Sequence, residues 1–310
     1  MNIKKFFLSM FITILVLVTM VAGLMAANFF FGTNLSDEIA KYLDKISGGT
    51  VNVLLLGLDE DKTRADVIMV VSIDPNEHDI HVLSIPRDTR VRYAEGRYDK
   101  INHAMGYKNP EERIISLVKQ VTGMPIHYYC EVGFAGFREV IDILGGVEFD
   151  VPVNMHYEDP AQKLSIHVNK GLQVLDGKKA EGVVRYRATY VTGDEQRINV
   201  QKDFLHALFE QKLNAKYLAK APALINEIYQ HVETNFSPAD AIKYAKSFKK
   251  MTAESLKTHT LPGESGYVNG VSYFIYDPAE TRELILTEFG YPEDEAAALK
   301  QQEKQAGLAE

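Results

Sequence analysis

The sequence predicts an α/β fold in which helices cover a largely buried sheet. Near-continuous apolar runs at 51–56, 67–73 and 126–132 are typical of strands that are covered on both faces. Segments with helical patterning alternate with such runs along most of the chain. Because strands that alternate with helices form layered α/β proteins, we expect a sheet sandwiched between helices.

An uncharged stretch, residues 6–31, precedes the expected domain, and Lys4 and Lys5 stand just before it. About 20 apolar residues span a bilayer, so this stretch predicts a transmembrane anchor. The two lysines hold residues 1–5 in the cytoplasm and place the rest of the chain outside, as in a single-pass protein of the cell membrane. A cleaved signal peptide is the alternative, although its apolar core is usually shorter, roughly 7–15 residues.

After the anchor we expect a stalk or linker at 32–49, one extracytoplasmic domain at 50–292 and a flexible tail at 293–310. The tail is charged and rich in Gln and Ala, which indicates a frayed helix or a disordered segment. Further strands are expected at 80–85, 147–153, 256–261 and 271–276, and an exposed hairpin at 156–168. Helices are expected at 110–122, 134–144, 176–186, 196–214, 221–232, 238–249 and 278–289. The first of these helices begins at Pro110 and is ended by Gly123.

The composition limits the classes of function. The formal net charge is −8, and an acidic chain argues against a nucleic-acid partner. Cys130 is the single cysteine, so an intrachain disulfide and a cysteine-based zinc site are excluded. The chain holds no GxxxxGK or GxGxxG phosphate-binding loop and no GxSxG nucleophile elbow. Nor do we expect a zinc site built from the scattered histidines His78, His81, His127, His156 and His167.

The most informative polar stretch is 84–89, Ser-Ile-Pro-Arg-Asp-Thr, which follows the apolar run 80–83. Pro86 ends the strand because it has no N–H to donate. Arg87 supplies a fork of donors suited to phosphate oxygens, and Asp88 supplies a hard oxygen ligand for a divalent cation. A loop at the end of a strand in an α/β fold lies where ligands usually bind. A surface ion pair that caps a turn is the alternative interpretation.

Three further polar clusters accompany this loop. Arginines together with two or three carboxylates are suited to a metal-bound polyphosphate, because guanidiniums hold the oxygens and Mg²⁺ offsets the remaining charge. For any one cluster, a solvated ion-pair network is the alternative. The clusters are Asp59, Arg64 and Asp66; Lys100, Ile101, Asn102 and His103; and Arg185, Arg187, Asp194, Arg197 and Gln201.

Seven blocks of the chain follow the order of the LytR-CpsA-Psr family, and the sequence resembles that family over about residues 50–210. The blocks are VLLLGLD (53–59), RADVIMVVSID (64–74), VLSIPRDTRV (82–91), KINHAMGY (100–107), TGMPIHYYCEVGFAGFREVIDILGGVEFDVP (122–152), GLQVLDGKKAEGVVRYR (171–187) and DxxRxxxQ (194–201). The resemblance implies an α/β/α sandwich around a central mixed sheet, with an apolar tunnel for a polyprenyl chain. It also implies a cell-envelope phosphotransferase. Such an enzyme moves a glycopolymer, for example teichoic acid or capsule, from a polyprenyl-pyrophosphate carrier to a peptidoglycan hydroxyl and releases polyprenyl phosphate.

The resemblance also assigns roles to residues. Asp66 and Asp88 are expected to hold Mg²⁺ or Mn²⁺, and together with Arg87 they form the expected catalytic group. The residues expected to bind the pyrophosphate are Arg64, Arg87, Lys100, Arg185, Arg187, Arg197 and Gln201, with Asp194 orienting the arginines. The chain departs from the usual family pattern at Gln196, Val200 and His103, where Gly, Arg and a small residue are common.

Two geometric expectations follow from this assignment. The guanidiniums of Arg87, Arg185, Arg187 and Arg197 should meet at one mouth of the sheet, beside Asp66 and Asp88. The apolar tunnel should be lined by strands 51–56, 67–73 and 126–132 and by helices 110–122 and 196–214.

The expected partners are the lipid-linked glycan, peptidoglycan and the membrane, with no nucleic acid. Two alternative functions stay open. One is a non-catalytic protein of the attenuator type, which binds polyprenyl-linked glycans or regulates the wall. The other is a polyprenyl-pyrophosphate pyrophosphatase that uses water as the acceptor.

Overall fold

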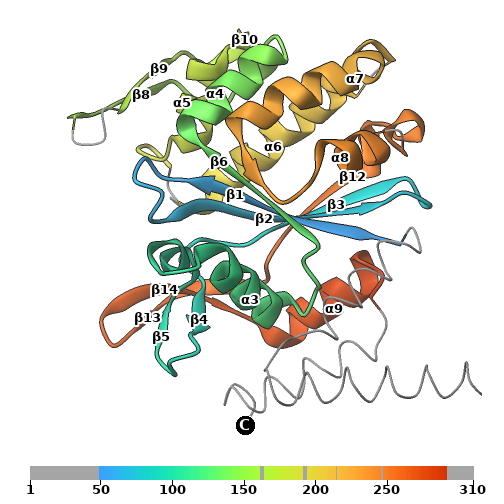
Figure 1. Cartoon of the computed structure of the whole chain (residues 1–310). Helices are drawn as coiled ribbons and strands as arrows, with labels where there is room; N and C mark the ends of the chain where they lie inside the picture. The colour runs from blue at the N-terminus through green and yellow to red at the C-terminus, as the bar shows by residue number, and fades with distance from the viewer. Residues whose placement is uncertain (1–48, 161–163, 191–193, 214, 246, 292–310) are drawn as a thin grey trace, which may run out of the picture. The chain divides into compact units, whose positions relative to one another are not determined.

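The computed structural model describes residues 49–160, 164–190, 194–213, 215–245 and 247–291 (Figure 1). Nearly all of them belong to one compact unit, which begins at Thr50. The predicted cytoplasmic N-terminus, anchor and stalk, and the predicted tail, lie outside the described residues. Across the residues that are described, no helix combines the length and the apolar character needed to cross a membrane.

The centre of the unit is a six-stranded sheet with the order β11-β6-β1-β2-β3-β12. β2 runs antiparallel to both of its neighbours, β1 and β3. β6 runs parallel to β1, and β12 runs parallel to β3. The sheet is therefore mixed, as the family resemblance implied. Its strands are β1 (Val51–Leu58), β2 (Ala65–Asp74), β3 (Asp79–Ser84), β6 (Tyr128–Gly133), β11 (Glu233–Thr234) and β12 (Leu256–Thr260).

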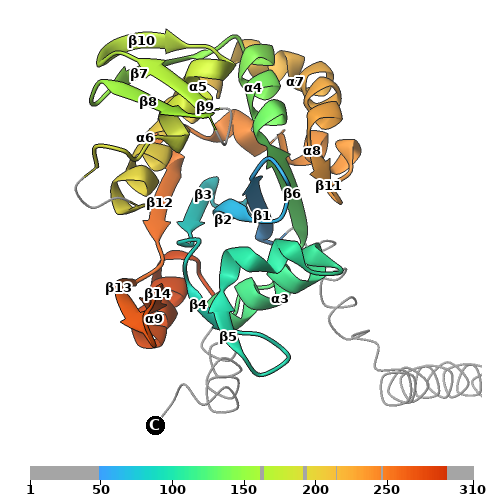
Figure 2. The same ribbon diagram turned by 90° about the vertical axis from the view of Figure 1, so that its left-hand side faces the viewer.

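Helices cover both faces of this sheet (Figures 1 and 2). One face carries α3 (Pro110–Thr122), α9 (Pro278–Glu288) and the short 3₁₀ helix η1 (Ile101–Gly106). The other face carries α4 (Phe134–Ile143), α5 (Gly177–Arg185), α6 (Asp194–Lys212), α7 (Ala215–Ile228) and α8 (Pro238–Ala245). Small two-stranded sheets flank these layers: β4 (Arg90–Arg92) with β5 (Tyr98–Lys100), β7 (Val147–Val151) with β10 (Gly171–Leu175), β8 (Met155–Asp159) with β9 (Leu164–Val168), and β13 (Gly263–Val268) with β14 (Val271–Tyr276). Short 3₁₀ turns, η3 (Tyr229–His231), η4 (Ser247–Lys250) and η5 (Ala253–Ser255), complete the described elements.

Local sequence signals explain several element boundaries. Pro110 occupies the first turn of α3, and Gly123 caps its end in the left-handed region with a φ of 71°, donating its N–H to the Lys119 carbonyl. In the β2–β3 turn, Asp74 Oδ1 accepts the N–H groups of Asn76 and Glu77 at 2.8 and 3.0 Å. The predicted starts and ends are confirmed at these positions, where a side chain or a glycine closes the backbone.

Other boundaries differ from the prediction. α7 begins at Ala215, earlier than the predicted 221, and it holds Pro222 inside the helix. The expected helix at 238–249 is α8, which ends at Ala245, and the 3₁₀ turn η4 follows at Ser247–Lys250. The pairs β4–β5 and β13–β14 were predicted only in part or not at all. Such short elements depend on their pairing partners more than on their own apolar pattern.

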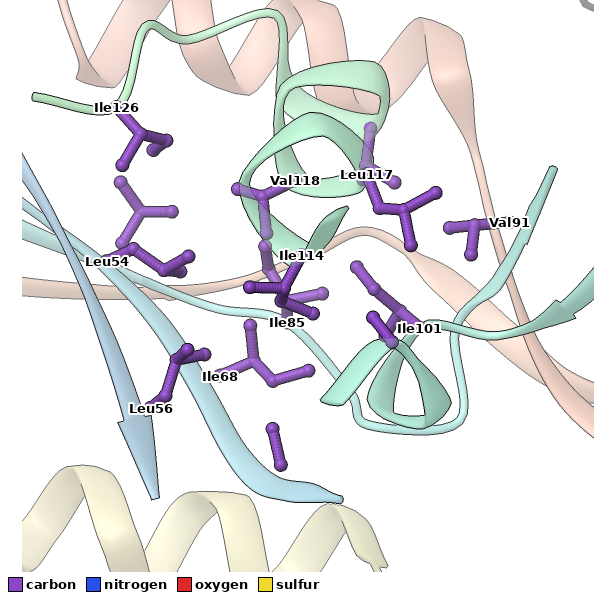
Figure 3. Close-up of a cluster of buried hydrophobic side chains, with 14 of the residues drawn as sticks. Leu54, Leu56, Ile68, Ile85, Val91, Ile101, Ile114, Leu117, Val118 and Ile126 are labelled. Atoms are coloured by element: carbon purple, nitrogen blue, oxygen red, sulfur yellow. The ribbon is translucent and has the colours of Figure 1, made fainter. Parts of the chain in front are cut away.

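The two faces of the sheet are packed differently. On the α3 face, Leu54, Leu56 and Ile68 are buried to 2 % exposure or less (Figure 3). On the opposite face, beneath α6 and η4, Leu55 and Val67 are only partly buried although helices cover them. The helices therefore leave Leu55 and Val67 incompletely covered, whereas Met69 and Val82 on the same face are buried.

The predicted lining of the apolar tunnel is wrong in one respect. Helix 110–122 is α3, which packs on Leu54 and Leu56, whereas helix 196–214 is α6, which packs on the face of Leu55 and Val67. The two helices therefore lie on opposite faces of the sheet and cannot line one cavity. A continuous apolar run in a strand shows that both faces are covered, but not which helix covers which face.

Candidate active site

The candidate site lies where the central strand β3 ends and its neighbour β2 begins. This side of the sheet, formed by strand ends, is called the sheet edge below. Because β2 and β3 are antiparallel, Met69 of β2 faces Ser84, the last residue of β3. The chain leaves β3 through Ile85, whose N–H still donates to the Ile68 carbonyl at 2.9 Å. The loop that follows, 86–89, is therefore anchored directly beside the first residues of β2.

This loop is a tight turn with a fixed shape. The Pro86 carbonyl accepts both the N–H of Thr89, at 3.0 Å, and its Oγ1 hydroxyl, at 2.5 Å. Thr89 is fully buried, and its carbonyl accepts the N–H of Ile101 at 2.9 Å. The turn is thus closed internally and tied to the start of η1.

Two distant segments hold the backbone of the loop from either side. The Arg87 carbonyl accepts the N–H of Asn102 at 3.2 Å, and the Asp88 carbonyl accepts the N–H of Phe274, in β14, at 2.9 Å. Because these hydrogen bonds use only the backbone of the loop, they fix its position and leave the side chains of Arg87 and Asp88 available for other contacts. The sequence analysis singled out Asn102 but missed Phe274, because nothing near Phe274 in sequence indicates a contact with this loop.

The two charged residues of the loop each form an ion pair. Arg87 Nη1 donates to Asp66 Oδ1 at 2.6 Å, and Lys100 Nζ lies 3.0 Å from Asp88 Oδ1. The two carboxyl side chains are 28 % and 32 % exposed, so a ligand can reach them. The structure therefore brings together four of the predicted site residues at the sheet edge.

Asp59 and Arg64 of the same predicted cluster have a different place. Asp59 Oδ1 accepts the N–H groups of Thr63 and Arg64 at 2.8 and 3.1 Å, which shapes the β1–β2 loop. Arg64 is exposed, with its side chain in solvent. Asp59 is thus a loop-capping residue, and its bonds explain why a carboxylate stands at the end of β1.

Arg185 is held by a buried carboxylate that the sequence analysis did not select. Glu181 Oε1 accepts from Arg185 Nη1, and Glu181 Oε2 accepts from Arg138 Nη1, both at 2.6 Å. The Glu181 side chain is only 8 % exposed, and the Arg185 guanidinium also lies 3.7 Å from the ring centre of Phe134. The spacing of Glu181 four residues before Arg185 on a helix was the signal that could have revealed it.

The remaining predicted residues surround the connection from α5 to α6. Arg185 ends α5, and Arg197 lies in the first turns of α6, where it is buried to 5 % exposure. Arg187 is exposed, and Asp194 is the first residue of α6. Gln201 donates its amide Nε2 to the Val184 carbonyl at 2.9 Å, which fixes α6 against the end of α5. The meeting of these arginines with Arg87 remains a prediction.

The three positions that depart from the family pattern also have clear surroundings. Gln196 is exposed, whereas Val200 is buried in the core that α5 and α6 share with the flanking hairpins. An apolar side chain at position 200 therefore contributes packing where the family commonly has an arginine. His103 Nδ1 lies 2.9 Å from Asp99 Oδ1, so the larger side chain there joins the η1 region to β5.

A second titratable group at the same sheet edge was missed. Glu131 of β6 is 5 % exposed and lines a cavity of about 300 Å³ with Leu58, Lys62 and Glu233. Burial, reinforced by the neighbouring carboxylates, raises the pKa of Glu131 to about 7. Burial also raises the pKa of the adjacent Cys130 thiol, to about 11, so this thiol stays protonated, as expected for a packed cysteine rather than a nucleophile.

Comparison with known proteins finds relatives that are named as teichoic acid transferases. The polyisoprenyl-teichoic acid–peptidoglycan teichoic acid transferase TagV of Bacillus subtilis strain 168 is 29% identical over 258 residues, which are 80% of this chain and 65% of TagV. The corresponding transferase TagU of Bacillus mycoides is 29% identical over 265 residues, covering 80% of this chain and 84% of TagU. This chain thus spans about two thirds of the length of TagV.

Solved structures give the same result. The crystal structure of B. subtilis TagV superposes with a TM-score of 0.69 at 28% identity, over 79% of this chain and 99% of that one. A structure of TagT bound to LI-WTA superposes with a TM-score of 0.63 at 25% identity, over 84% of this chain and 92% of that one. The LytR_cpsA_psr family model matches residues 32–288, and the chain therefore belongs to the LytR_cpsA_psr family.

Proposed function

We propose that this protein is a phosphotransferase that moves a glycopolymer from a polyprenyl-pyrophosphate carrier to a peptidoglycan hydroxyl and releases polyprenyl phosphate. Family membership and relatives that carry transferase names support the reaction class. The observation that carries the proposal is the rigid loop 86–89, which holds Arg87 against Asp66 and Asp88 against Lys100 at an accessible sheet edge.

The pyrophosphate suits this arrangement because its oxygens can take the place of the carboxylates as partners of the two cations. Arg87 and Lys100 are only partly buried and can turn from their carboxylate partners to phosphate oxygens. Arg185 is oriented by Glu181 and Phe134, so it offers a guanidinium whose direction is already set. Charge-assisted contacts of this kind are what phosphoryl transfer needs, since positioning and charge neutralisation dominate its catalysis.

The site also fits a divalent cation. Asp66 and Asp88 each present a partly exposed carboxylate on a rigid backbone, and Mg²⁺ is usually bound by one or two carboxylates together with phosphate oxygens. When bound, such an ion would offset phosphate charge. We expect Asp66→Asn and Asp88→Asn each to remove most transfer, whereas Asp59→Asn, which keeps its loop hydrogen bonds, should retain it. Full activity in excess EDTA would count against the metal.

The lipid part of the carrier is proposed to lie on the loosely filled face of the sheet. Leu55, Val67 and Val71 are apolar and partly exposed beneath the helices, so an alkyl chain could enter without displacing polar groups. The opposite face is closed by α3 and offers no comparable room around Leu54 and Leu56.

The proposed step exchanges one phosphorus–oxygen bond for another. The acceptor hydroxyl oxygen bonds to the phosphorus nearer the sugar, and the bond from that phosphorus to the bridging oxygen breaks. The bridging oxygen leaves with the polyprenyl phosphate, and the hydroxyl proton passes to a carboxylate of the site or to water. Arg87 and Lys100 are placed to stabilise the charge that develops on the phosphate oxygens.

A location outside the cytoplasm is part of the proposal. It depends on residues 6–31, which lie outside the described part of the chain, and on Lys4 and Lys5 before them. Protease added to intact spheroplasts should digest the domain while it remains in the membrane fraction. Protection from the protease, or recovery of a soluble cleaved form, would contradict the anchor.

Turnover tests the proposed reaction. The full-length chain, given a polyprenyl-pyrophosphate glycan, peptidoglycan oligomers and Mg²⁺, should release polyprenyl phosphate and produce a glycan-linked oligomer. Release at the same rate without peptidoglycan would instead indicate a pyrophosphatase. Tight binding of the lipid-linked glycan without any release would indicate the attenuator type of protein.

A further inference from the structure

Two histidines and a glutamate meet on the α9 side of the sheet, away from the candidate active site. His81 lies in β3, His259 in β12, and Glu288 is the last residue of α9. His81 Nδ1 and His259 Nε2 are 3.3 Å apart, and His259 Nε2 is 3.9 Å from Glu288 Oε2. Within the described part of the chain, these residues form a group of three side chains whose ligand atoms all lie within 4.8 Å of one another.

The fold explains why residues so distant in sequence come together. β3 and β12 are parallel neighbours, with His81 opposite Lys257 and His259 opposite Leu83. Ile80 and Val82 point to the α6 face, so His81, between them, points to the other. Thr258 likewise contacts His206 of α6, which leaves the next residue, His259, on the α9 side.

The two histidines are largely sheltered from solvent, whereas the glutamate is exposed. The His81 and His259 side chains are 13 % and 16 % exposed, and the Glu288 side chain is 41 % exposed. The Phe289 ring lies 5.4 Å from each imidazole, centre to centre, and closes one side. A metal ion at this point would be partly screened from water, with a free position on the exposed side.

The ligand types and distances match zinc. Zinc bonds to histidine nitrogen and carboxylate oxygen are about 2.0–2.2 Å long, so two ligands in a tetrahedron are about 3.3–3.4 Å apart. The two imidazole nitrogens already have this separation, and the exposed Glu288 carboxylate needs only a small rotation to reach it.

A carboxylate also lies on the far side of the His81 ring. Asp79 Oδ2 is 4.0 Å from His81 Nε2, beyond hydrogen-bond distance, and it is held by Lys257 Nζ at 2.7 Å. Metal-bound histidines commonly donate their second N–H to a carboxylate, and a small shift of Asp79 would allow that bond here. His81 would then bind through Nδ1, the atom that faces His259.

We propose that His81, His259 and Glu288 form a Zn²⁺ site that joins α9 and β12 to β3. The site is distinct from the proposed phosphate-binding edge, because five residues of largely extended chain, roughly 15–20 Å, separate His81 from Arg87. A bound ion would tie the segment that carries β14, which contacts the Asp88 carbonyl, to the central sheet. The proposal does not depend on the proposed transferase function.

Titration of the chelator-treated, full-length chain with Zn²⁺ tests the site. His156 and His167 lie side by side on the β8–β9 hairpin and could bind Zn²⁺ as a competing site. All variants in this test therefore carry His167→Ala, which removes that pair. We expect one Zn²⁺ per chain and a higher thermal midpoint, since a ligand that binds the folded state stabilises it. The proposal would be overturned if the His167→Ala protein failed to bind Zn²⁺, whether or not the wild type bound it.

Variants assign the ligands. His259→Gln should weaken Zn²⁺ binding by at least about 100-fold, because even outer partners of metal ligands are worth roughly 10–100-fold. Glu288→Gln, at an exposed position that tolerates change, should weaken it less but measurably, which protects the test if the histidine variant misfolds. His206→Ala, on the other face of β12, is the matched control and should bind normally. Unchanged affinity in both ligand variants would refute the site.

Co²⁺ provides an independent readout of geometry. In the His167→Ala background, Co²⁺ should give the intense visible absorption of a four-coordinate ion, and this absorption should be lost on adding His259→Gln and retained on adding His206→Ala. The competing explanation is a direct N–H···N hydrogen bond between the imidazoles, whose planes are within 5° of parallel. In that case Co²⁺ would show only the weak spectrum of the hydrated ion.

Discussion

The clearest structural perturbation is Glu181→Gln, which removes the charge between Arg138 and Arg185. In the folded protein each guanidinium donates to one oxygen of this carboxylate at 2.6 Å. Glutamine keeps the size of the side chain, but it offers one oxygen instead of two, and its amide N–H₂ must face one of the guanidiniums. The substitution therefore removes the negative charge that both guanidiniums share and leaves one of them beside a donor it cannot bond.

The expected magnitude follows from the burial of the three side chains. A hydrogen bond to a charged group contributes about 1.5–3 kcal/mol, and the contact with Arg185, 15 % exposed, should count nearly in full. Arg138 is 42 % exposed, so solvent screening makes its contact worth much less. We therefore expect a loss of about 2–3 kcal/mol, which lowers the thermal midpoint by roughly 4–12 °C in a unit of this size.

The assay pairs thermal unfolding with the rate of polyprenyl phosphate release. Release should fall by at least about ten-fold at a temperature where Glu181→Gln is still folded, because Arg185 loses its fixed direction. Arg138→Gln is the matched control: it breaks the more exposed contact, keeps the one to Arg185, and should lower both quantities far less. If Glu181→Gln keeps the wild-type midpoint and rate, Glu181 does not position Arg185.

Two further predictions concern the sheet. Because burial raises the pKa of Glu131 from 4.5 to about 7, its ionisation costs the folded state, and stability falls as pH rises through that window. Glu131→Gln should therefore be more stable than the wild type above pH 7, by at most about 3 kcal/mol, with no gain below pH 4.5. Glu139→Gln, at an exposed position, is the control and should show no such pH-dependent gain. Parallel pH profiles of the unfolding free energy for wild type and Glu131→Gln, measured with denaturant, would contradict this. Val67→Phe should reduce transfer from the lipid carrier with little loss of thermal stability, because it fills the roomy face, whereas Ile68→Phe on the close-packed face should cost about 1–3 kcal/mol of stability. Equal stability losses in the two variants would show that the faces are packed alike.

The sequence predicts local structure here better than it predicts contacts between distant segments. Pro110 and Gly123 bound α3 because proline favours the first helical turn and glycine the left-handed cap. The apolar run at 51–56 is a central strand because both its faces are covered. Which helix covers which face depends on chain connections, and the tunnel prediction was wrong for that reason.

The candidate site shows the same division. Arg87, Asp88, Asp66 and Lys100 were predicted from charge and spacing, and the structure brings them together. Phe274 was missed because its bond to the Asp88 carbonyl joins segments far apart in the sequence, with no local signal at either end.

The histidine group was missed for a similar reason. His81 appeared to be a strand-edge histidine without a partner, since a parallel pairing of β3 with β12 is needed to bring His259 to it. Glu131 is one polar residue in an apolar strand, and only the structure shows that it is buried beside a cavity.

The measurement that tests the central claim most directly is the rate of acceptor-dependent transfer by Arg87→Lys. Lysine keeps the charge beside Asp66 but cannot reproduce a two-point grip on phosphate oxygens. The matched control is Arg113→Lys, whose guanidinium binds both oxygens of Glu95 at 2.9 and 3.1 Å on a different part of the domain. The account predicts that Arg87→Lys transfers at least about ten-fold more slowly at an unchanged thermal midpoint, whereas Arg113→Lys transfers normally. Transfer by Arg87→Lys at the wild-type rate would contradict the assignment of the 86–89 loop as the pyrophosphate site.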